Sequence, residues 1–218
     1  MISRRGFFKL MGVMGATALA GLALPGCGNG NASSSSASSA AASSASPSPS
    51  AAASASPAAA PRILVACFSA TGNTRPIAKA AAQALDADYF EIEPAEPYTD
   101  ADLYYSDDST RATAEQNNPE TRPALASTPD LGAYDVVLIG HPIWWGMAPR
   151  LICTLLESVD LAGKTVAEFC TSGSSGIEEA NAELMELAPS ARWIGAHRFA
   201  AGTPDEEVAE WVASLAIG

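Results

Sequence analysis

Residues 62–74 read Arg-Ile-Leu-Val-Ala-Cys-Phe-Ser-Ala-Thr-Gly-Asn-Thr, and this stretch decides the fold. Its first half, 62–68, is a short continuous apolar run, which is typical of a strand buried on both faces of a sheet. Its second half is rich in hydroxyls and leads into a predicted helix that starts near Thr74. Pro76 falls in the first turn of this helix, where proline is tolerated. A buried strand that passes through a tight turn into a helix indicates an α/β domain.

The alternation of strand and helix continues to the end of the chain. For the last helix, Thr203, Pro204 and Glu206 predict an N-cap, a first helical position and a capping box. Alternation of this kind implies a parallel sheet with helices on both faces. Ligands of such sheets bind at the carboxyl ends of the strands, where the strand order reverses. Further strands are predicted at 89–92, 135–140, 165–170 and 193–199, and further helices from Pro149, over 178–187 and after Thr203.

Composition divides the 218 residues into three parts. Residues 28–61 are almost entirely Ser, Ala, Pro, Gly and Asn, a composition that cannot bury a core. We therefore expect a signal segment at 1–26, a disordered linker at 27–61 and a folded domain at 62–217. That domain has roughly 155 residues, which is enough for a single well-buried core.

The N-terminus has the layout of a secretory signal. Basic residues within 3–9 precede an uncharged run, 10–24, which as a helix would span only about 22 Å, less than a bilayer core. A basic start, a brief apolar run and small residues predict that 1–26 is a signal peptide. The paired arginines in Ser3-Arg-Arg-x-Phe7 resemble the twin-arginine export signal, which carries folded proteins. An ordinary secretory signal that happens to hold two arginines is the alternative.

Leu24-Pro-Gly-Cys27 resembles a lipobox, although Pro25 departs from the usual pattern. The resemblance implies cleavage before Cys27 and acylation there, which would anchor the protein at the outer face of the cytoplasmic membrane. A plain cleavage site with an incidental Cys is the alternative. As a flexible coil the linker would span roughly 30 Å, so the domain is expected to meet membrane-bound partners beside its anchor.

The chain is strongly acidic. Its formal net charge is −12, and loss of Arg4, Arg5 and Lys9 with the signal segment would take it to −15. An acidic surface repels phosphates, so nucleic-acid binding is not expected. The acidic charge favours basic partners, or a site whose electric field disfavours the addition of electrons.

Residues 69–74 form the first of three candidate ligand loops. Hydroxyls, a Gly that lets the backbone curl and free amides at a helix N-terminus suit a phosphate monoester. A Walker A loop is excluded because it needs a Lys, which 69–74 lacks. A dinucleotide-binding loop is not expected either, because the Gly-x-Gly-x-x-Gly pattern is absent from the sequence. The low-molecular-weight phosphatase loop has five residues between Cys and Arg, whereas seven separate Cys67 from Arg75. A response regulator would carry acidic residues at the end of this strand, where this chain has none.

The other two loops follow later strands. Residues 140–146 read Gly-His-Pro-Ile-Trp-Trp-Gly, and two adjacent indoles cannot both enter one core face. A flat aromatic ligand would give one indole a partner, while packing of both under the next helix is the alternative. His141 is interpreted as a structural or rim residue rather than a proton donor. Residues 171–176 read Thr-Ser-Gly-Ser-Ser-Gly, and side chains this small let backbone amides approach a ligand.

Together the three loops resemble those of the flavodoxin family. Ser/Thr-x-Thr-Gly-Asn-Thr after a first strand is similar to the flavodoxin loop for the phosphate of FMN, and 142–146 is similar to a segment of one flavodoxin branch. The resemblance covers 62–217. It implies an α/β fold, a flavodoxin-like doubly wound sandwich with a five-stranded parallel sheet of order 2-1-3-4-5 and helices on both faces. It also implies FMN as the cofactor, with no metal.

The resemblance further implies where FMN would bind. The first loop would hold the phosphate, an indole of the second would stack on the isoalloxazine, and amides of the third would donate to the pyrimidine edge. Gly146 or a neighbouring peptide would face flavin N5, and the side chains of Ser69, Thr71, Asn73 and Thr74 would bond the phosphate. The predicted cofactor-binding residues are Ser69, Ala70, Thr71, Gly72, Asn73, Thr74, Pro142, Ile143, Trp144, Trp145, Gly146, Thr171, Ser172, Gly173, Ser174 and Gly176.

One departure concerns the second face of the flavin. Better-known flavodoxins usually carry a Tyr in the third loop to cover it, and this chain has none there. The face would therefore be open, or covered by the acidic segment 98–108 through Tyr104 and Tyr105.

The leading interpretation of function is an FMN-binding electron carrier with membrane-bound redox partners. An FMN-dependent reductase of quinones or another small acceptor is the alternative, and a module that has lost its cofactor is a third. No residues in the loops suit an acid–base pair, so no catalytic residue is assigned.

The remaining notable residues are interpreted as structural. Cys67 and Cys170 would end the first and fourth strands with another strand between them, about 9.5 Å apart, too far for a disulfide. These two and Cys153 are therefore expected to be buried thiols. Arg111 and Glu115 are interpreted as a structural pair.

Overall fold

The computed structural model describes residues 60–217. The export signal, Cys27 and the linker up to residue 59 lie outside the described residues, so what the sequence predicts for them stays a prediction. Within 60–217, no helix is both long and apolar enough to cross a membrane.

The centre of the domain is a five-stranded parallel sheet of order β2-β1-β3-β4-β5. This confirms the predicted doubly wound α/β fold and its strand order. The strand order reverses at β1, because β2 lies on one side of it and β3 on the other. The strands are β1 (Ile63–Cys67), β2 (Asp88–Glu91), β3 (Val136–Pro142), β4 (Thr165–Thr171) and β5 (Arg192–Phe199).

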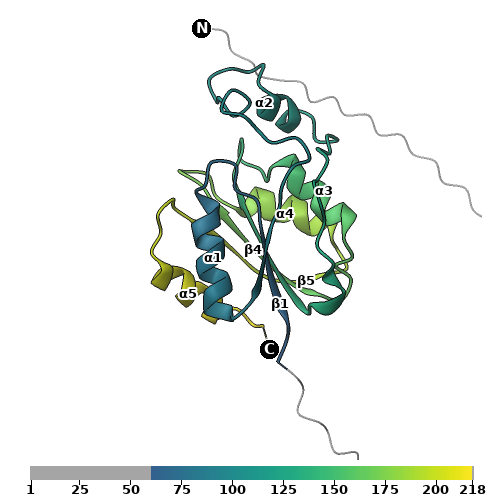
Figure 1. The fold of residues 1–218 in the computed structure, drawn as a ribbon, viewed down its shortest axis with the longest axis vertical. Coiled ribbons are helices and arrows are strands. Elements are labelled where there is room, and N and C mark those ends of the chain that lie inside the picture. The colour runs from purple at the N-terminus through teal and green to yellow at the C-terminus, as the bar shows by residue number, and fades with distance from the viewer. Residues whose placement is uncertain (1–59, 218) are drawn as a thin grey trace, which may run out of the picture. The chain divides into compact units, whose positions relative to one another are not determined.

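Helices cover both faces of the sheet (Figure 1). The helices α1 (Thr74–Leu85) and α5 (Asp205–Ser214) pack on one face, and α3 (Arg150–Ser158) and α4 (Glu178–Leu187) on the other. Alternate residues of β1 serve the two cores: Leu64 and Ala66 face α3 and α4, whereas Val65 and Cys67 face α1 and α5. A strand buried on both faces accounts for the continuous apolar run in the sequence.

The cysteine prediction is confirmed for the described residues. Cys67, Cys153 and Cys170 are all buried and form no disulfide. Cys67 belongs to β1 and Cys170 to β4, with β3 between them as expected.

Two regions differ from the sequence-based expectation. The segment between β2 and β3 holds a short helix, α2 (Arg111–Gln116), and a 3-10 turn, Leu131–Ala133, neither of which was predicted. At the last helix, the predicted capping box is wrong. Thr203 donates its hydroxyl to the carbonyl of Ala200 at 2.8 Å, Pro204 stays extended, and α5 begins at Asp205 without a side-chain cap.

Candidate cofactor site

The three candidate loops meet at the carboxyl edge of the sheet. They surround a cavity of about 180 Å³, here called the loop cavity, which also receives one residue from the 98–108 segment and one from the chain after β5. None of the described residues that line it is charged. They are Thr71, Asn73, Tyr105, Pro142, Ile143, Trp144, Thr171, Ser172, Gly173 and Ala201.

The first loop presents backbone amides. Ser69 Oγ accepts hydrogen bonds from the amides of Thr74 and Arg75, at 3.1 Å each, and so caps the start of α1. The amides of residues 69–73 have no hydrogen-bond acceptor among the described residues. Gly72 lies in the left-handed region with φ +84°, which lets the turn curl. Free amides that point out of a turn at a helix N-terminus form an anion site.

Arg75 does not supply a cation to this loop. Its guanidinium lies on Glu91, with Nη2 2.8 Å from Oε1. Partial burial acts to raise the pKa of Glu91, but hydrogen bonds from Arg75 and Tyr89 outweigh it and lower that pKa below its ordinary value. An anion in the first loop would therefore be held by amides, hydroxyls and the dipole of α1.

The first and third loops are joined by a pair of hydroxyls. Thr74 Oγ1 and Thr171 Oγ1 lie 2.7 Å apart, and both residues are buried. Thr71 and Asn73 line the loop cavity, as Thr171 does, and the Asn73 amide donates to Thr71 Oγ1 at 3.2 Å. The phosphate contacts predicted for these side chains stay predictions.

The second loop makes a tight turn that separates the two indoles. Trp144 and Met147 exchange backbone hydrogen bonds at 2.9 and 3.0 Å, and Trp145 and Gly146 between them have φ of +50° and +86°. Trp144 is 4% exposed and packs edge-on against Phe68 and Tyr98. The second indole, Trp145, is 39% exposed. The two indoles therefore do not share one core face.

Tyr105 covers the exposed indole. Its ring is stacked on Trp145, with centroids 4.3 Å apart and planes 15° apart, and its hydroxyl donates to the carbonyl of Ile143 at 3.4 Å. Tyr105 also lines the loop cavity. The segment 98–108, which the sequence suggested as a cover for the second flavin face, therefore reaches the loop cavity through Tyr105.

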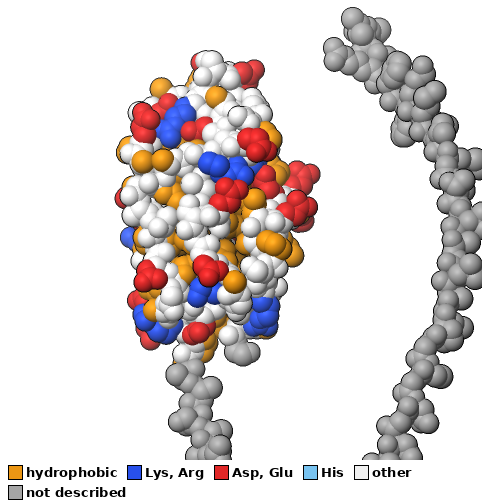
Figure 2. All heavy atoms as spheres, turned by 90° about the vertical axis from the view of Figure 1, so that its right-hand side faces the viewer, with side chains coloured by type: hydrophobic (Ala, Val, Ile, Leu, Met, Phe, Trp, Pro, Cys, Tyr) orange, Lys and Arg blue, Asp and Glu red, His pale blue; other side chains and the backbone are white. Residues whose placement is uncertain are grey.

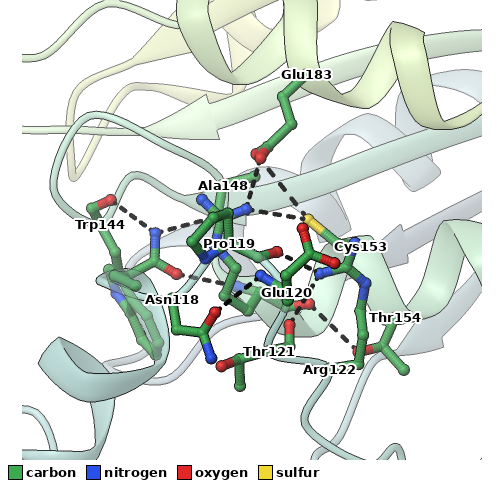
Figure 3. Close-up of polar contacts among 12 residues, drawn as sticks. Asn118, Pro119, Glu120, Thr121, Arg122, Trp144, Ala148, Cys153, Thr154 and Glu183 are labelled. Atoms are coloured by element: carbon green, nitrogen blue, oxygen red, sulfur yellow. Dashed lines mark hydrogen bonds and ion pairs between the residues drawn. The ribbon is translucent and has the colours of Figure 1, made fainter.

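Gln116, which sequence reasoning missed, holds the second loop in place. Its amide nitrogen donates to the carbonyls of Trp144 and Ala148, at 3.1 and 3.2 Å, and its amide oxygen accepts from the backbone amide of Arg150 at 3.0 Å. Trp144 and Ala148, whose carbonyls accept these two bonds, are labelled in Figure 3. Gln116 is the last residue of α2, so this short helix positions both the turn and the start of α3.

The predicted site residues do not all share one cavity. Ser69 and Ala70 line a neighbouring cavity of about 370 Å³ on the β2 side of the first loop. Gly146 and Gly176 line another, of about 320 Å³, together with Glu178 and Glu179 of α4. Eight of the predicted residues line the loop cavity: Thr71, Asn73, Pro142, Ile143, Trp144, Thr171, Ser172 and Gly173. Gly72, Thr74, Trp145 and Ser174 line none of these three cavities.

Behind the second loop, His141 belongs to a buried polar network. Its Nδ1 donates to the carbonyl of Pro142 at 2.9 Å, and its Nε2 lies 2.8 Å from Oε1 of Glu168. Asn181 of α4 donates to the other carboxylate oxygen at 2.7 Å. The interpretation of His141 as structural agrees with this placement, because the ring is fully buried and faces away from solvent.

The chain matches the family model described as Flavodoxin over residues 62–215. The chain belongs to the flavodoxin family. No curated protein matches this flavodoxin-family chain.

Solved structures agree with the assignment to the flavodoxin family. A candidate flavoprotein from Bacteroides uniformis ATCC 8492 is 44% identical, with a TM-score of 0.68, and the match covers 71% of this chain and 99% of that one. A similar candidate flavoprotein from Bacteroides eggerthii DSM 20697 is 40% identical, with a TM-score of 0.68 and coverage of 72% and 99%. A flavoprotein from Lactobacillus acidophilus NCFM, solved in complex with FMN, is 27% identical, with a TM-score of 0.55 and coverage of 70% and 99%.

Proposed function

We propose that this protein binds FMN noncovalently in the three loops and acts as an electron carrier at the outer face of the cytoplasmic membrane. The observation that carries the proposal is the row of free amides at residues 69–73 beside an uncharged cavity at the sheet's carboxyl edge. A phosphate would be held by the amides, and a planar ring would lie toward Ile143, Trp144 and Tyr105. Bound FMN would supply the redox chemistry. The FMN complex of the Lactobacillus acidophilus relative supports the choice of cofactor.

The size of the loop cavity bears on how FMN would fit. At about 180 Å³ it is smaller than the roughly 300–1,000 Å³ typical of small-molecule sites. FMN would therefore extend beyond it, over the rim where Tyr105 lies on Trp145. If Tyr105 moved away from Trp145, the isoalloxazine ring of FMN would stack on that indole, as the resemblance to flavodoxins implies.

An electron carrier is favoured over a reductase because the loop cavity has no titratable acid–base pair. Among its described lining residues only Tyr105 has an ionisable side chain, and burial raises the pKa of that phenol above its ordinary value. An electron carrier needs only a bound cofactor and an accessible edge.

The decisive experiment is an absorption spectrum of the purified full chain, taken before and after stepwise reduction with dithionite. One bound FMN per chain, released on denaturation, supports the proposal. A colourless protein that takes up no added FMN contradicts it. Steady turnover of a quinone with a nicotinamide donor would support the reductase alternative instead.

Removal of one hydroxyl tests whether the first loop binds the phosphate of FMN. Thr71→Val removes a hydroxyl that lines the loop cavity while it nearly preserves shape. Because a hydrogen bond to a charged group contributes about 1.5–3 kcal/mol, we expect FMN to bind at least tenfold more weakly. Thr128→Val, at an exposed threonine outside the site, is the matched control and should leave the dissociation constant within twofold. Equal affinity of the two variants would exclude the hydroxyl as a phosphate ligand.

The membrane anchor rests on the sequence of the N-terminal segment. If Cys27 is acylated, the full chain will sediment with membranes, and Cys27→Ser will release it into the soluble exported fraction. Substitution of both Arg4 and Arg5 by Lys should hold the FMN-loaded protein inside the cell. A wild-type protein found wholly in the soluble fraction would contradict the anchor without affecting the FMN site.

The partners we propose are membrane-bound redox proteins with basic docking surfaces. The formal net charge of −12 favours such partners over a distance. On the face shown in Figure 2, acidic and basic side chains are interspersed with apolar atoms, so on that face the attraction would come from the net charge rather than from a patch of one sign.

A further inference from the structure

Arg198 binds the third loop from behind. It lies at the carboxyl end of β5, paired in register with Cys170 of β4. Its Nη2 donates to two successive carbonyls of the loop, those of Ser172 at 2.8 Å and Gly173 at 3.0 Å. One guanidinium thus fixes the direction of two adjacent peptide groups.

Peptide geometry then decides where the amides of this loop point. No peptide bond among the described residues is cis, and in a trans peptide the N–H points opposite to the C=O. Because both carbonyls face Arg198, the amides of Gly173 and Ser174 face away from it. The Ser174 amide donates to Ser172 Oγ at 3.3 Å. The Gly173 amide has no acceptor among the described residues, and Gly173 lines the loop cavity.

The charge of Arg198 is not neutralised by a carboxylate. Arg198 takes part in none of the ion pairs found within residues 60–217, and its Nε is buried without a hydrogen-bond partner. The lining of the cavity in front of the loop is uncharged. A positive charge separated from a neutral cavity by a single loop acts on whatever ligand the cavity holds, and the effect is weakened by the solvent that reaches this half-buried side chain.

We propose that Arg198 is a positioning residue that presents the Gly173 amide to the pyrimidine edge of FMN and favours its reduced form. The inference rests on the proposed FMN function. When FMN takes up two electrons and one proton, the ring system gains one negative charge, which is shared over the pyrimidine side. A nearby cation and an amide donor stabilise that charge more than they stabilise the neutral oxidised ring. In the test, dithionite supplies the electrons and water supplies the proton.

The test compares variants that separate charge from hydrogen bonding, in the purified full chain. Arg198→Met and Arg198→Gln remove the charge, and the Gln variant keeps an N–H donor. Arg198→Lys keeps the charge. Arg192→Met is the control, since Arg192 lies at the opposite end of the same strand and bonds Thr165 and the carbonyl of Ala216. The readouts are the dissociation constant for oxidised FMN, the two-electron midpoint potential and the circular dichroism spectrum.

We expect the neutral variants to bind oxidised FMN about tenfold more weakly and reduced FMN about a hundredfold more weakly. The tenfold difference between the two forms lowers the midpoint potential by about 30 mV. Arg198→Lys should weaken binding with a much smaller change of potential, and Arg192→Met should change neither quantity. If Arg198→Met does not fold, the affinity and midpoint potential of Arg198→Gln decide whether the charge of Arg198 matters.

The possible results separate the role of Arg198 from FMN binding itself. If the wild-type protein binds no FMN, the proposed function itself fails. If the wild type binds FMN and a folded neutral variant keeps the wild-type affinity and potential, the role of Arg198 is refuted. Equal weakening of oxidised and reduced FMN would also refute it, because that result needs only a disturbed loop and no effect of charge.

Discussion

At the scale of single residues, Gly140 shows how closely neighbouring strands approach beneath the site. A Cβ built on Gly140 of β3 would overlap the ring of Phe169 on β4. That ring is fully buried and packs against Phe199 and Trp211, so it has no free direction in which to move. Gly140 therefore serves packing, although it stands at the start of the second loop.

We expect Gly140→Ala to lower the free energy of unfolding by about 1–3 kcal/mol, the cost of overpacking a core. Urea denaturation followed by circular dichroism measures this. Gly173→Ala is the matched control, because a Cβ there meets no atom within 4 Å, and its stability should stay within about 0.5 kcal/mol of wild type. A Gly140→Ala variant as stable as this control would show that the core can absorb the methyl group.

At the scale of elements, the network of His141, Glu168 and Asn181 ties β3, β4 and α4 together. A carbonyl can only accept, so the bond to Pro142 requires a proton on His141 Nδ1. The 2.8 Å contact between Nε2 and Glu168 requires one further proton shared between them. The pair therefore has no net charge, which is consistent with the complete burial of both side chains.

Removal of one member should be costly. We expect Glu168→Ala to lower the free energy of unfolding by about 3–5 kcal/mol, since it leaves Nε2 of the buried imidazole without a partner and removes the acceptor of the half-buried Asn181 amide. Glu168→Gln should cost less, because an amide can still bond both groups. Glu186→Ala, at an exposed position on α4, is the control. Equal urea midpoints for Glu168→Ala and the control would contradict a structural role for the network.

At the scale of the whole molecule, buried thiols make stability depend on alkaline pH. Burial raises the pKa of Cys153 to about 11 and that of Cys170 to about 12, and it also raises the pKa of Cys67. Thiols of the unfolded chain ionise near pH 9. Above that pH the unfolded state loses protons that the folded state keeps, so the free energy of unfolding falls as the pH rises toward 11 or 12.

Each thiol should contribute up to about 1.4 kcal/mol per pH unit to this fall. Urea denaturation at pH 8 and pH 10 measures the total, to which the buried phenols also contribute. Comparison with Cys153→Ala isolates one thiol, since the variant should lose less stability than the wild type between the two pH values. An identical loss in both proteins would mean that Cys153 ionises equally easily in the folded and unfolded states.

The sequence was enough to predict the fold and the three loops that meet at the carboxyl edge of the sheet. Buried parallel strands are continuous apolar runs, and the loops that follow them carry the unusual residues, so the strands and the three loops followed from local patterns. The strand order came from the resemblance to flavodoxins. The helix α2 was missed because six residues carry no clear periodicity. The capping prediction at Thr203 failed because its hydroxyl bonds back to Ala200 instead.

Only the tertiary structure decided how the loops are held and which residues meet in one cavity. The contacts of Arg198 with the third loop and of Gln116 with the second join residues that are 25 to 32 positions apart in the sequence. Tyr105 stacks on Trp145 across a longer separation of 40 positions. No local pattern records such pairs, because a buried polar side chain takes its partner from whichever unpaired backbone group the packing of distant elements places within reach.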